Sequence, residues 1–322
     1  MSGRTRVLRL LLAGFLVVWC GLFLRAENTA KSQVRVVVLE HTGPHWTAGL
    51  LYQFPEAAAD ASDAAAEVGF CAGAGDTPAL ALAAAEQELP QQAGYRLCTG
   101  LLLTQEITAE TLQTAERFFA EKPLERRSVR VIGAETSCAE LLRRGKEDPQ
   151  LPAQLLRAVE KAEATAPRLY ERRLGLLIPL LEETAETAGE ALLVSGTQTL
   201  RLPADEAKAA QLLQGRSGDL SFSLDSGVVT FRRCVVSVEE RNEGFFLLLT
   251  GQRRAGDAPP SARACEELAD LCTRTVEHCW AAGVDLLRLE AVRCLRQGSG
   301  AGEWTTKNAC PQLWTDVTFM AF

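Results

Sequence analysis

The C-terminal part of the chain constrains its fold most, because several strong local patterns follow one another there. Residues 261–280 place apolar side chains on one helix face, with three cysteines spaced seven residues apart. Asp285 then lies near the start of an apolar run at 284–295, which predicts a strand. Trp304 and Trp314 follow, before a closing strand. This order predicts a sheet packed on a long helix.

Three further strands are predicted ahead of that helix, and short turns containing glycine separate them. They cover 220–224, 228–239 and 245–250. Closely spaced strands with short turns favour antiparallel pairing. We therefore expect residues 217–322 to form a C-terminal α+β domain, in which an antiparallel sheet packs on the long helix.

Residues 31–145 contain both strand-like and helix-like patterns of apolar residues. The β-branched run at 33–40 predicts a strand, and Asp76 before Pro78 predicts a helix start with Asp76 as its cap. Further strand and helix patterns alternate up to residue 144. The polar, proline-containing stretch at 145–152 predicts a linker.

A small middle unit is predicted after the linker. Its patterns are a helix over 153–163, a second helix over 168–183 that Pro179 would kink, a hairpin around 195–196 and a last helix over 203–214. The fold class is therefore α+β. We expect a signal peptide or membrane anchor followed by three small mixed domains, with the divisions 1–30, 31–145, 146–216 and 217–322.

The N-terminus has the form of a membrane-targeting segment. Arg4, Arg6 and Arg9 precede an unbroken apolar run at 10–24, an arrangement that leaves the basic end in the cytoplasm and the rest of the chain outside. Cys20 in this run is a lipidation candidate, although Trp19 before it is a poor fit to the small residues of lipoprotein signals. An uncleaved signal anchor is the alternative. Both predict a membrane-anchored chain on the extracytoplasmic face.

Composition restricts the partners. A formal net charge of −7 and the absence of a basic stripe exclude a typical nucleic-acid binder. A hydrophobic content of 47% with 23% charged residues is typical of a chain that buries real cores.

The cysteines do not predict a metal site. Cys265, Cys272 and Cys279 lie two helical turns apart, roughly 10.5 Å along the axis, whereas zinc ligands converge within about 2.3 Å of one ion. We read these three as core lining, and most other cysteines as buried free thiols. We predict no metal and no cofactor.

Catalytic patterns are also weak. The chain has three histidines, and none lies near a Gly-x-Ser-x-Gly motif. The glycines at 73 and 75 precede a helix but lack the lysine of a phosphate-binding loop. We therefore predict that the protein is not an enzyme and assign no catalytic residue.

An ordered set of segments carries a family resemblance. The segments are Thr77-Pro78-Ala79-Leu80, the run from Tyr95 to Leu103, the run from Val194 to Leu200, Val284-Asp285-Leu286-Leu287, Trp304 and Trp314. Together they resemble the Ger(x)C family, the C-subunit lipoproteins of bacterial spore germinant receptors. The chain lacks the Trp-Asp signature with which family members usually begin after the lipidated cysteine.

The resemblance implies a three-domain extracytoplasmic subunit of a nutrient germinant receptor. Such a subunit acts in spore germination, at the spore inner membrane, by assembling with integral membrane subunits. It implies structural roles for Asp285, Trp304 and Trp314, the two tryptophans being expected to close the C-terminal core. The alternatives are a stand-alone solute-binding lipoprotein of the cell envelope and, with less support, an exported hydrolase.

Overall fold

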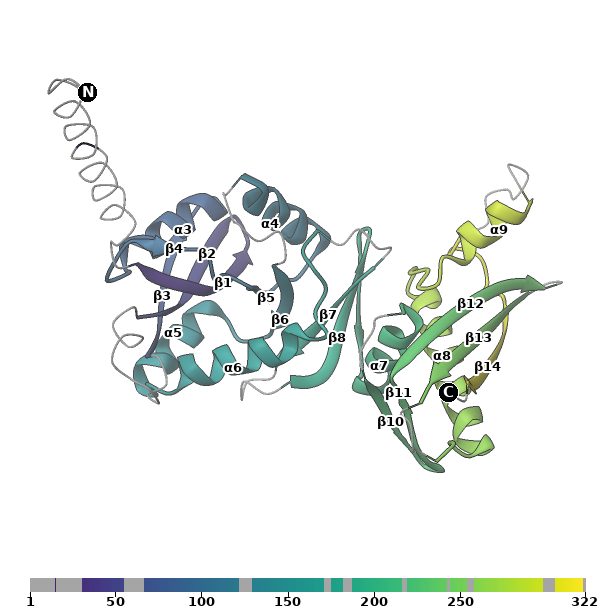
Figure 1. The fold of residues 1–322 in the computed structure, drawn as a ribbon. Helices are drawn as coiled ribbons and strands as arrows, with labels where there is room; N and C mark the ends of the chain where they lie inside the picture. The colour runs from purple at the N-terminus through teal and green to yellow at the C-terminus, as the bar shows by residue number, and fades with distance from the viewer. Residues whose placement is uncertain are drawn as a thin grey trace, which may run out of the picture.

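A computed structural model describes residue 15 and residues 31–54, 67–121, 129–170, 175–181, 187–215, 219–241, 244–253, 258–297 and 305–320. The predicted signal or anchor, apart from Phe15, lies outside this part of the chain. Among the described helices, none has both the length and the hydropathy needed to cross a bilayer. Figure 1 shows two lobes, one with strands β1 to β8 and helices α3 to α6, the other with α7 to β14.

One large sheet forms the centre of the first lobe. Its strands run in the order β3-β2-β1-β5-β6-β7-β8-β9, with β4 paired to β1. The pairs from β1 through β5 and β6 to β7 are parallel, and the outer pairs are antiparallel. The strands are β1 (Ser32–Thr42), β2 (His45–Gln53), β3 (Val68–Gly75), β4 (Ala93–Gly94), β5 (Gly100–Gln105), β6 (Arg130–Ala134), β7 (Leu176–Leu181), β8 (Thr187–Ser195) and β9 (Gln198–Leu202).

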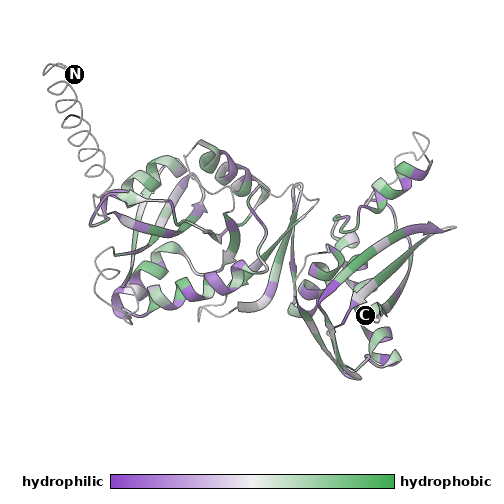
Figure 2. Ribbon diagram, in the orientation of Figure 1, coloured by the Kyte–Doolittle hydropathy of each residue, from purple (hydrophilic) through white to green (hydrophobic). Residues whose placement is uncertain are grey.

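Helices cover both faces of the part of this sheet formed by β1 to β6. Helices α3 (Pro78–Gln87) and α4 (Ala109–Glu121) share a core with Val37 on one face. Helices α5 (Cys138–Glu147) and α6 (Leu151–Glu163) share a second core with Val38 on the other. Central strands are therefore apolar on both sides, as expected of a covered parallel sheet. Figure 2 shows the helices as mixed green and purple, in keeping with one buried and one solvent-facing side.

Several local predictions for this lobe are confirmed and others are wrong. The helices expected at 137–144 and 153–163 are present as α5 and α6. The helix expected over 168–183 is wrong, because residues 176–181 form β7. That run is almost entirely buried and has no period of its own, so its pattern does not distinguish strand from helix. Pro179 lies in β7 beside an irregularity in the pairing with β8, where a missing N–H is tolerated.

Strands β7 to β9 belong to both lobes. On one face, Ile178 and Val194 join the core beneath α3 and α4. On the other face, Leu177, Leu193 and Leu202 join the core of the second lobe. The hairpin expected around residues 195–196 is present as β8 and β9. The division at residues 31–145, 146–216 and 217–322 stays a prediction.

The second lobe holds two small sheets and a long helix. Strands β10 and β11 form a hairpin, and the other sheet has the order β12-β13-β14. Strand β14 runs parallel to β13, so the expectation of a purely antiparallel sheet is wrong. The chain crosses through α8 between the two strands. The elements are α7 (Ala204–Leu213), β10 (Leu220–Leu224), β11 (Gly227–Phe231), β12 (Arg233–Arg241), β13 (Gly244–Gln252), α8 (Ala262–Ala281), α9 (Leu289–Gln297) and β14 (Gln312–Met320).

The long helix follows its sequence pattern closely. The Ser261 side chain caps α8 by accepting a hydrogen bond of 3.1 Å from the backbone N–H of Ala264. Cys272, Val276 and Cys279 are buried on the stripe that the spacing predicts. Within the described residues the chain thus has three sheets and seven helices, the mixed helix and strand content expected from the sequence.

Candidate functional site

Two of the four residues singled out from the sequence lie outside the described part of the chain. Cys20 and Trp304 are these two, so their predicted roles as lipidation candidate and structural anchor stay predictions. Asp285 and Trp314 are described, and both lie in the second lobe. Asp285 precedes helix α9, whereas Trp314 lies in strand β14.

Asp285 caps a helix that the sequence did not predict. Its two carboxylate oxygens accept hydrogen bonds of 2.9 Å from the backbone N–H groups of Leu289 and Glu290. These groups belong to the first turn of α9, where a negative charge also complements the helix dipole. The strand expected over residues 284–295 is therefore wrong, because the Asp285 cap and the positive φ of Arg288 start a helix there.

Helix α9 is attached to the sheet through a buried carboxylate. The Glu240 side chain on β12 is 5% exposed and accepts a hydrogen bond of 3.0 Å from Nε of Arg293. Arg296 also donates to the backbone carbonyl of Glu240. These contacts hold one side of α9 against β12, whereas Leu295 is 88% exposed. In Figure 1, α9 projects from the upper edge of the second lobe.

Trp314 lies on the surface, not in the core. Strand alternation in β14 turns Val317 inward and Trp314 outward, where 39% of it is exposed. The expectation that Trp314 closes the core is therefore wrong. The residue that does so is Trp280 of α8, which is 2% exposed and donates from Nε1 to the carbonyl of Asn308 at 2.9 Å. Its place near the end of the apolar stripe was the signal that could have identified it.

The outward residues of β12, β13 and β14 define an open face of the small sheet. Residues on the opposite side, such as Phe245 and Leu247, pack in the core with α8. The open face comprises Arg233, Val235, Ser237, Glu239 and Arg241 of β12, Phe246, Leu248, Thr250 and Gln252 of β13, and Gln312, Trp314, Asp316, Thr318 and Met320 of β14. All of these residues are exposed or half-buried.

An aromatic cluster lies at one end of the open face. Phe246 pairs with Trp314 on β14 and with Glu239 on β12. The Arg241 guanidinium lies 4.3 Å from the centroid of the Phe246 ring, a cation–π contact. The Trp314 indole lies against Gly244, where a side chain would collide with the ring. Tryptophan, phenylalanine and arginine together are typical of the centre of protein–protein interfaces.

The cysteines are free thiols in the described part of the chain. Burial raises the pKa of Cys98 in the first lobe and of Cys272 in the second to about 12. Such thiols stay protonated at neutral pH and are poor nucleophiles. Cys294, which lies in the run where the sequence predicts a strand, is exposed on α9. Among the described side chains, no three His, Cys, Asp or Glu residues gather in a way that could hold a metal ion.

The crevice at the carboxyl ends of the parallel strands is filled by the chain itself. The connections after β5 and β6 pass to opposite faces of the sheet, an arrangement that often creates a ligand site. Here Glu40 of β1 accepts hydrogen bonds from the backbone N–H of Cys138 at 2.5 Å and from Thr104 at 3.1 Å. Its carboxylate thus occupies the position at the start of α5 where an anionic ligand would bind.

No family model and no curated protein matches the chain. Among solved structures, the chain is similar to the crystal structure of the GerBC protein, with a TM-score of 0.45 and 12% sequence identity. The similarity covers 88% of this chain and 97% of that chain, and it is a likeness of fold.

Proposed function

We propose that the chain is a membrane-tethered, extracytoplasmic subunit of a nutrient germinant receptor, acting in spore germination by assembly with integral membrane subunits. The observation that carries this proposal is the order of the segments that resemble the Ger(x)C family. Residues 77–80 begin α3, residues 95–103 lead into β5, and residues 194–200 span the end of β8, the turn and the start of β9. Asp285 and Trp314 follow in the second lobe in the family order.

The open face of the small sheet supports assembly by protein contact. It presents Phe246, Trp314 and Arg241 side by side, surrounded by charged and hydroxyl-bearing side chains. Interfaces commonly combine an aromatic centre with a polar rim. We therefore assign the contact with an integral membrane subunit to this face, with the cluster of Phe246, Trp314 and Arg241 as its main contact.

The N-terminal segment supports tethering. The basic flank and the apolar run at 10–24 are typical of an exported chain that stays at the membrane. Lipidation of Cys20 and an uncleaved anchor predict different products. A Cys20→Ser variant would lose incorporation of a labelled fatty acid if Cys20 is acylated, and it would be unchanged in membrane association if the segment is an uncleaved anchor.

The test is affinity purification of the tagged full-length chain from detergent-solubilised membranes of sporulating cells. We expect stoichiometric recovery of multi-pass membrane subunits. Trp314→Ser should greatly reduce that recovery, whereas Val228→Ser, which changes an exposed residue of β11 outside the open face, should not. Recovery of the chain alone, equally from vegetative cells and spores, would contradict the receptor assignment and favour an envelope lipoprotein of another kind.

A further inference from the structure

Along the outer edge of β3, backbone groups have no hydrogen-bond partner among the described residues. In this part of the chain β3 pairs with β2 alone, and the backbone N–H of Phe54 donates to the carbonyl of Glu67 at 3.2 Å. Because bonding pairs alternate along an antiparallel ladder, odd-numbered residues of β3 bond to β2. The N–H and C=O groups of Val68, Phe70, Ala72 and Ala74 therefore point outward. Within the described residues, no backbone hydrogen bond reaches them.

This edge lacks the usual protection against pairing. Strand β3 has the sequence Val-Gly-Phe-Cys-Ala-Gly-Ala-Gly, eight residues without a charge or a proline. Edge strands in proteins are normally short, charged, bulged or interrupted by proline, which prevents association with another strand. Strand β9, at the opposite edge, is shorter and carries Arg201, which is paired with Glu190 at 2.5 Å. The two edges of the sheet therefore differ in how open they are to a further strand.

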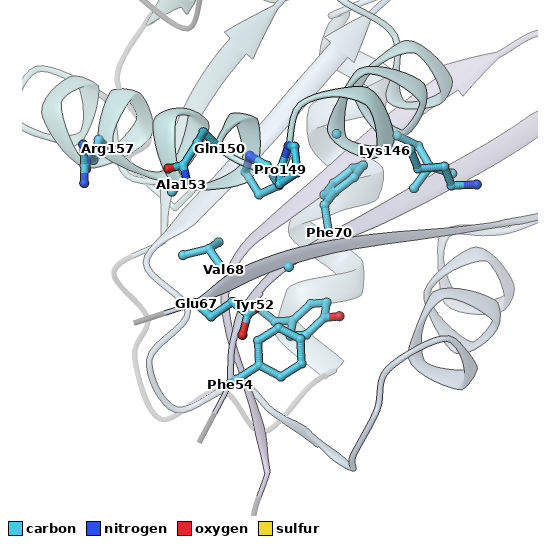
Figure 3. A pocket seen from close by; sticks show the side chains of 14 residues that line it. Tyr52, Phe54, Glu67, Val68, Phe70, Lys146, Pro149, Gln150, Ala153 and Arg157 are labelled. Atoms are coloured by element: carbon cyan, nitrogen blue, oxygen red, sulfur yellow. The ribbon is translucent and has the colours of Figure 1, made fainter. Parts of the chain in front are cut away.

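A hollow of about 460 Å³ lies along the open edge. Its lining comes from both faces of the sheet. Tyr52 belongs to the core beneath α3 and α4, whereas Phe70 packs against the core beneath α5 and α6. The hollow therefore surrounds the edge of β3 instead of lying within one layer. Figure 3 shows Tyr52, Phe54 and Glu67 on one side of the strand and the connection between α5 and α6 on the other.

The helical side of the hollow is cationic. Lys146 at the end of α5 and Arg157 in α6 are both exposed and line it. Neither forms an ion pair with another described residue, whereas Arg143, on the same helix as Lys146, is held by Glu140 and Glu147. Glu67 is the acidic residue of the lining. Two cations thus face a hollow in a chain whose formal net charge is −7.

From the open edge, the hollow and its charge, we propose that β3 binds an extended segment of a partner protein as an additional strand, with an acidic side chain of that segment beside Lys146 or Arg157. Main-chain hydrogen bonds to the outward groups of β3 supply affinity, and the hollow selects the side chain. An acidic residue is favoured because a carboxylate pairs with either cation of the lining. This inference is independent of the receptor assignment, because it rests on β3 and the hollow alone.

Binding of a defined peptide to the purified full-length chain in detergent tests the proposal. The probe is an eight-residue peptide, equal to β3 in length, of alternating valine and threonine with one central aspartate. We expect saturable binding by fluorescence anisotropy, together with slower hydrogen–deuterium exchange at residues 68–75. The same peptide with alternate backbone amides N-methylated cannot form the ladder and should not bind. Equal binding of both peptides would overturn the proposal.

Variants of the chain separate the contribution of backbone hydrogen bonds to peptide binding from the contribution of charge. Ala72→Pro removes an outward N–H that β2 does not use, so it should weaken binding at least about tenfold with little change in thermal unfolding. Lys146→Gln with Arg157→Gln should lower affinity for the aspartate peptide by a similar factor and leave an asparagine peptide unaffected. Lys161→Gln, one turn after Arg157 on α6 and outside the hollow, is the matched control.

A second copy of the chain is the competing occupant of the edge. Light scattering of the full-length chain distinguishes it, because pairing of β3 with β3 would give a dimer that Ala72→Pro converts to a monomer. That result would overturn the partner-peptide proposal. Failure of peptide binding would leave co-purification of membrane subunits unaffected, so the two proposals can fail separately.

Discussion

The two sheets of this chain differ in what they leave uncovered: the large sheet leaves an edge, and the small sheet leaves a face. The large sheet of the first lobe has helices on both faces between β1 and β6, so its open boundary is the edge of β3. The small sheet of the second lobe has α8 on one face, and its other face is open. An open edge offers backbone hydrogen bonds, whereas an open face offers side chains. The two lobes therefore expose different chemical groups.

The burial patterns of the strands show the same difference. In β1, the run from Val36 to Leu39 is buried throughout, because both faces are covered. In β12, exposed and half-buried residues alternate, because one face is solvated. A continuous apolar run thus indicates a strand covered on both faces of its sheet, and an alternating run indicates a strand covered on one face.

The largest expected effect contrasts two neighbouring phenylalanines of β13. Phe245 is fully buried against α8, and Phe246 lies on the open face. Phe245→Ala should lower the free energy of unfolding by about 3–5 kcal/mol, because it leaves a cavity in the core. Phe246→Ala should cost less than about 1 kcal/mol and instead reduce recovery of membrane subunits. Urea denaturation of both variants checks this, and equal losses of stability would mean that the open face is covered.

Breaking the contact that fixes α9 should have the next largest effect. Glu240→Gln removes the buried carboxylate to which the half-buried Arg293 donates, which should cost about 3 kcal/mol. Replacing both residues, Glu240→Gln with Arg293→Met, should restore part of the loss because the guanidinium is removed together with the carboxylate. Denaturation midpoints of the single and double variants give the coupling energy. Additive effects would show that the two side chains do not interact.

Alkaline pH should destabilise both lobes through their buried thiols. Burial raises the pKa of Cys98 and Cys272 from 9.0 to about 12, so between pH 9 and 12 the unfolded chain loses these protons and the folded chain keeps them. Stability then falls as pH rises through this window. Cys98→Ala and Cys272→Ala should each flatten the fall in melting temperature between pH 8.5 and 10.5. An unchanged slope in either variant would exclude that thiol as a contributor.

The smallest expected effect separates two candidate caps of α3. The sequence pointed to Asp76, but the side chain of Thr77 accepts the hydrogen bond from the backbone N–H of Leu80, at 3.2 Å. Thr77→Ala should therefore cost about 1 kcal/mol. Asp76 pairs with His45 on the exposed surface, so Asp76→Ala should change stability by a few tenths at most. Thermal unfolding of the two variants ranks them, and a larger loss for Asp76→Ala would reverse the assignment.

The amphipathic helices could be predicted from the sequence because their signals are local. Helix α8 has a serine cap and an apolar stripe, and α5 begins after Ser137 in the same way. Strand β7 could not be distinguished from a helix, since its apolar residues serve two cores at once. Helix α9 was missed because its capping residue, Asp285, lies within an apolar run that also fits a strand.

The open edge of β3 and the open face of the small sheet could be identified only from the structure. No local pattern states that β3 is the last strand of the sheet, because its position depends on pairings far apart in the chain. The hollow likewise joins Tyr52 to Arg157 across about a hundred positions. Trp314 was identified as important from the sequence. Whether its side chain is buried or exposed depends on which face of the sheet α8 covers, and the sequence does not state this.

The strands shared by the two lobes, β7 to β9, limit how far one lobe can move relative to the other. Because Leu177 and Ile178 of β7 point into different cores, the lobes are joined by a packed layer and not by a flexible tether. Bending between them would open one hydrophobic interior or the other. We therefore expect a displacement of the second lobe to move the first lobe, and with it the edge of β3. If both proposed contacts are made, the chain would hold its two partners at a fixed separation.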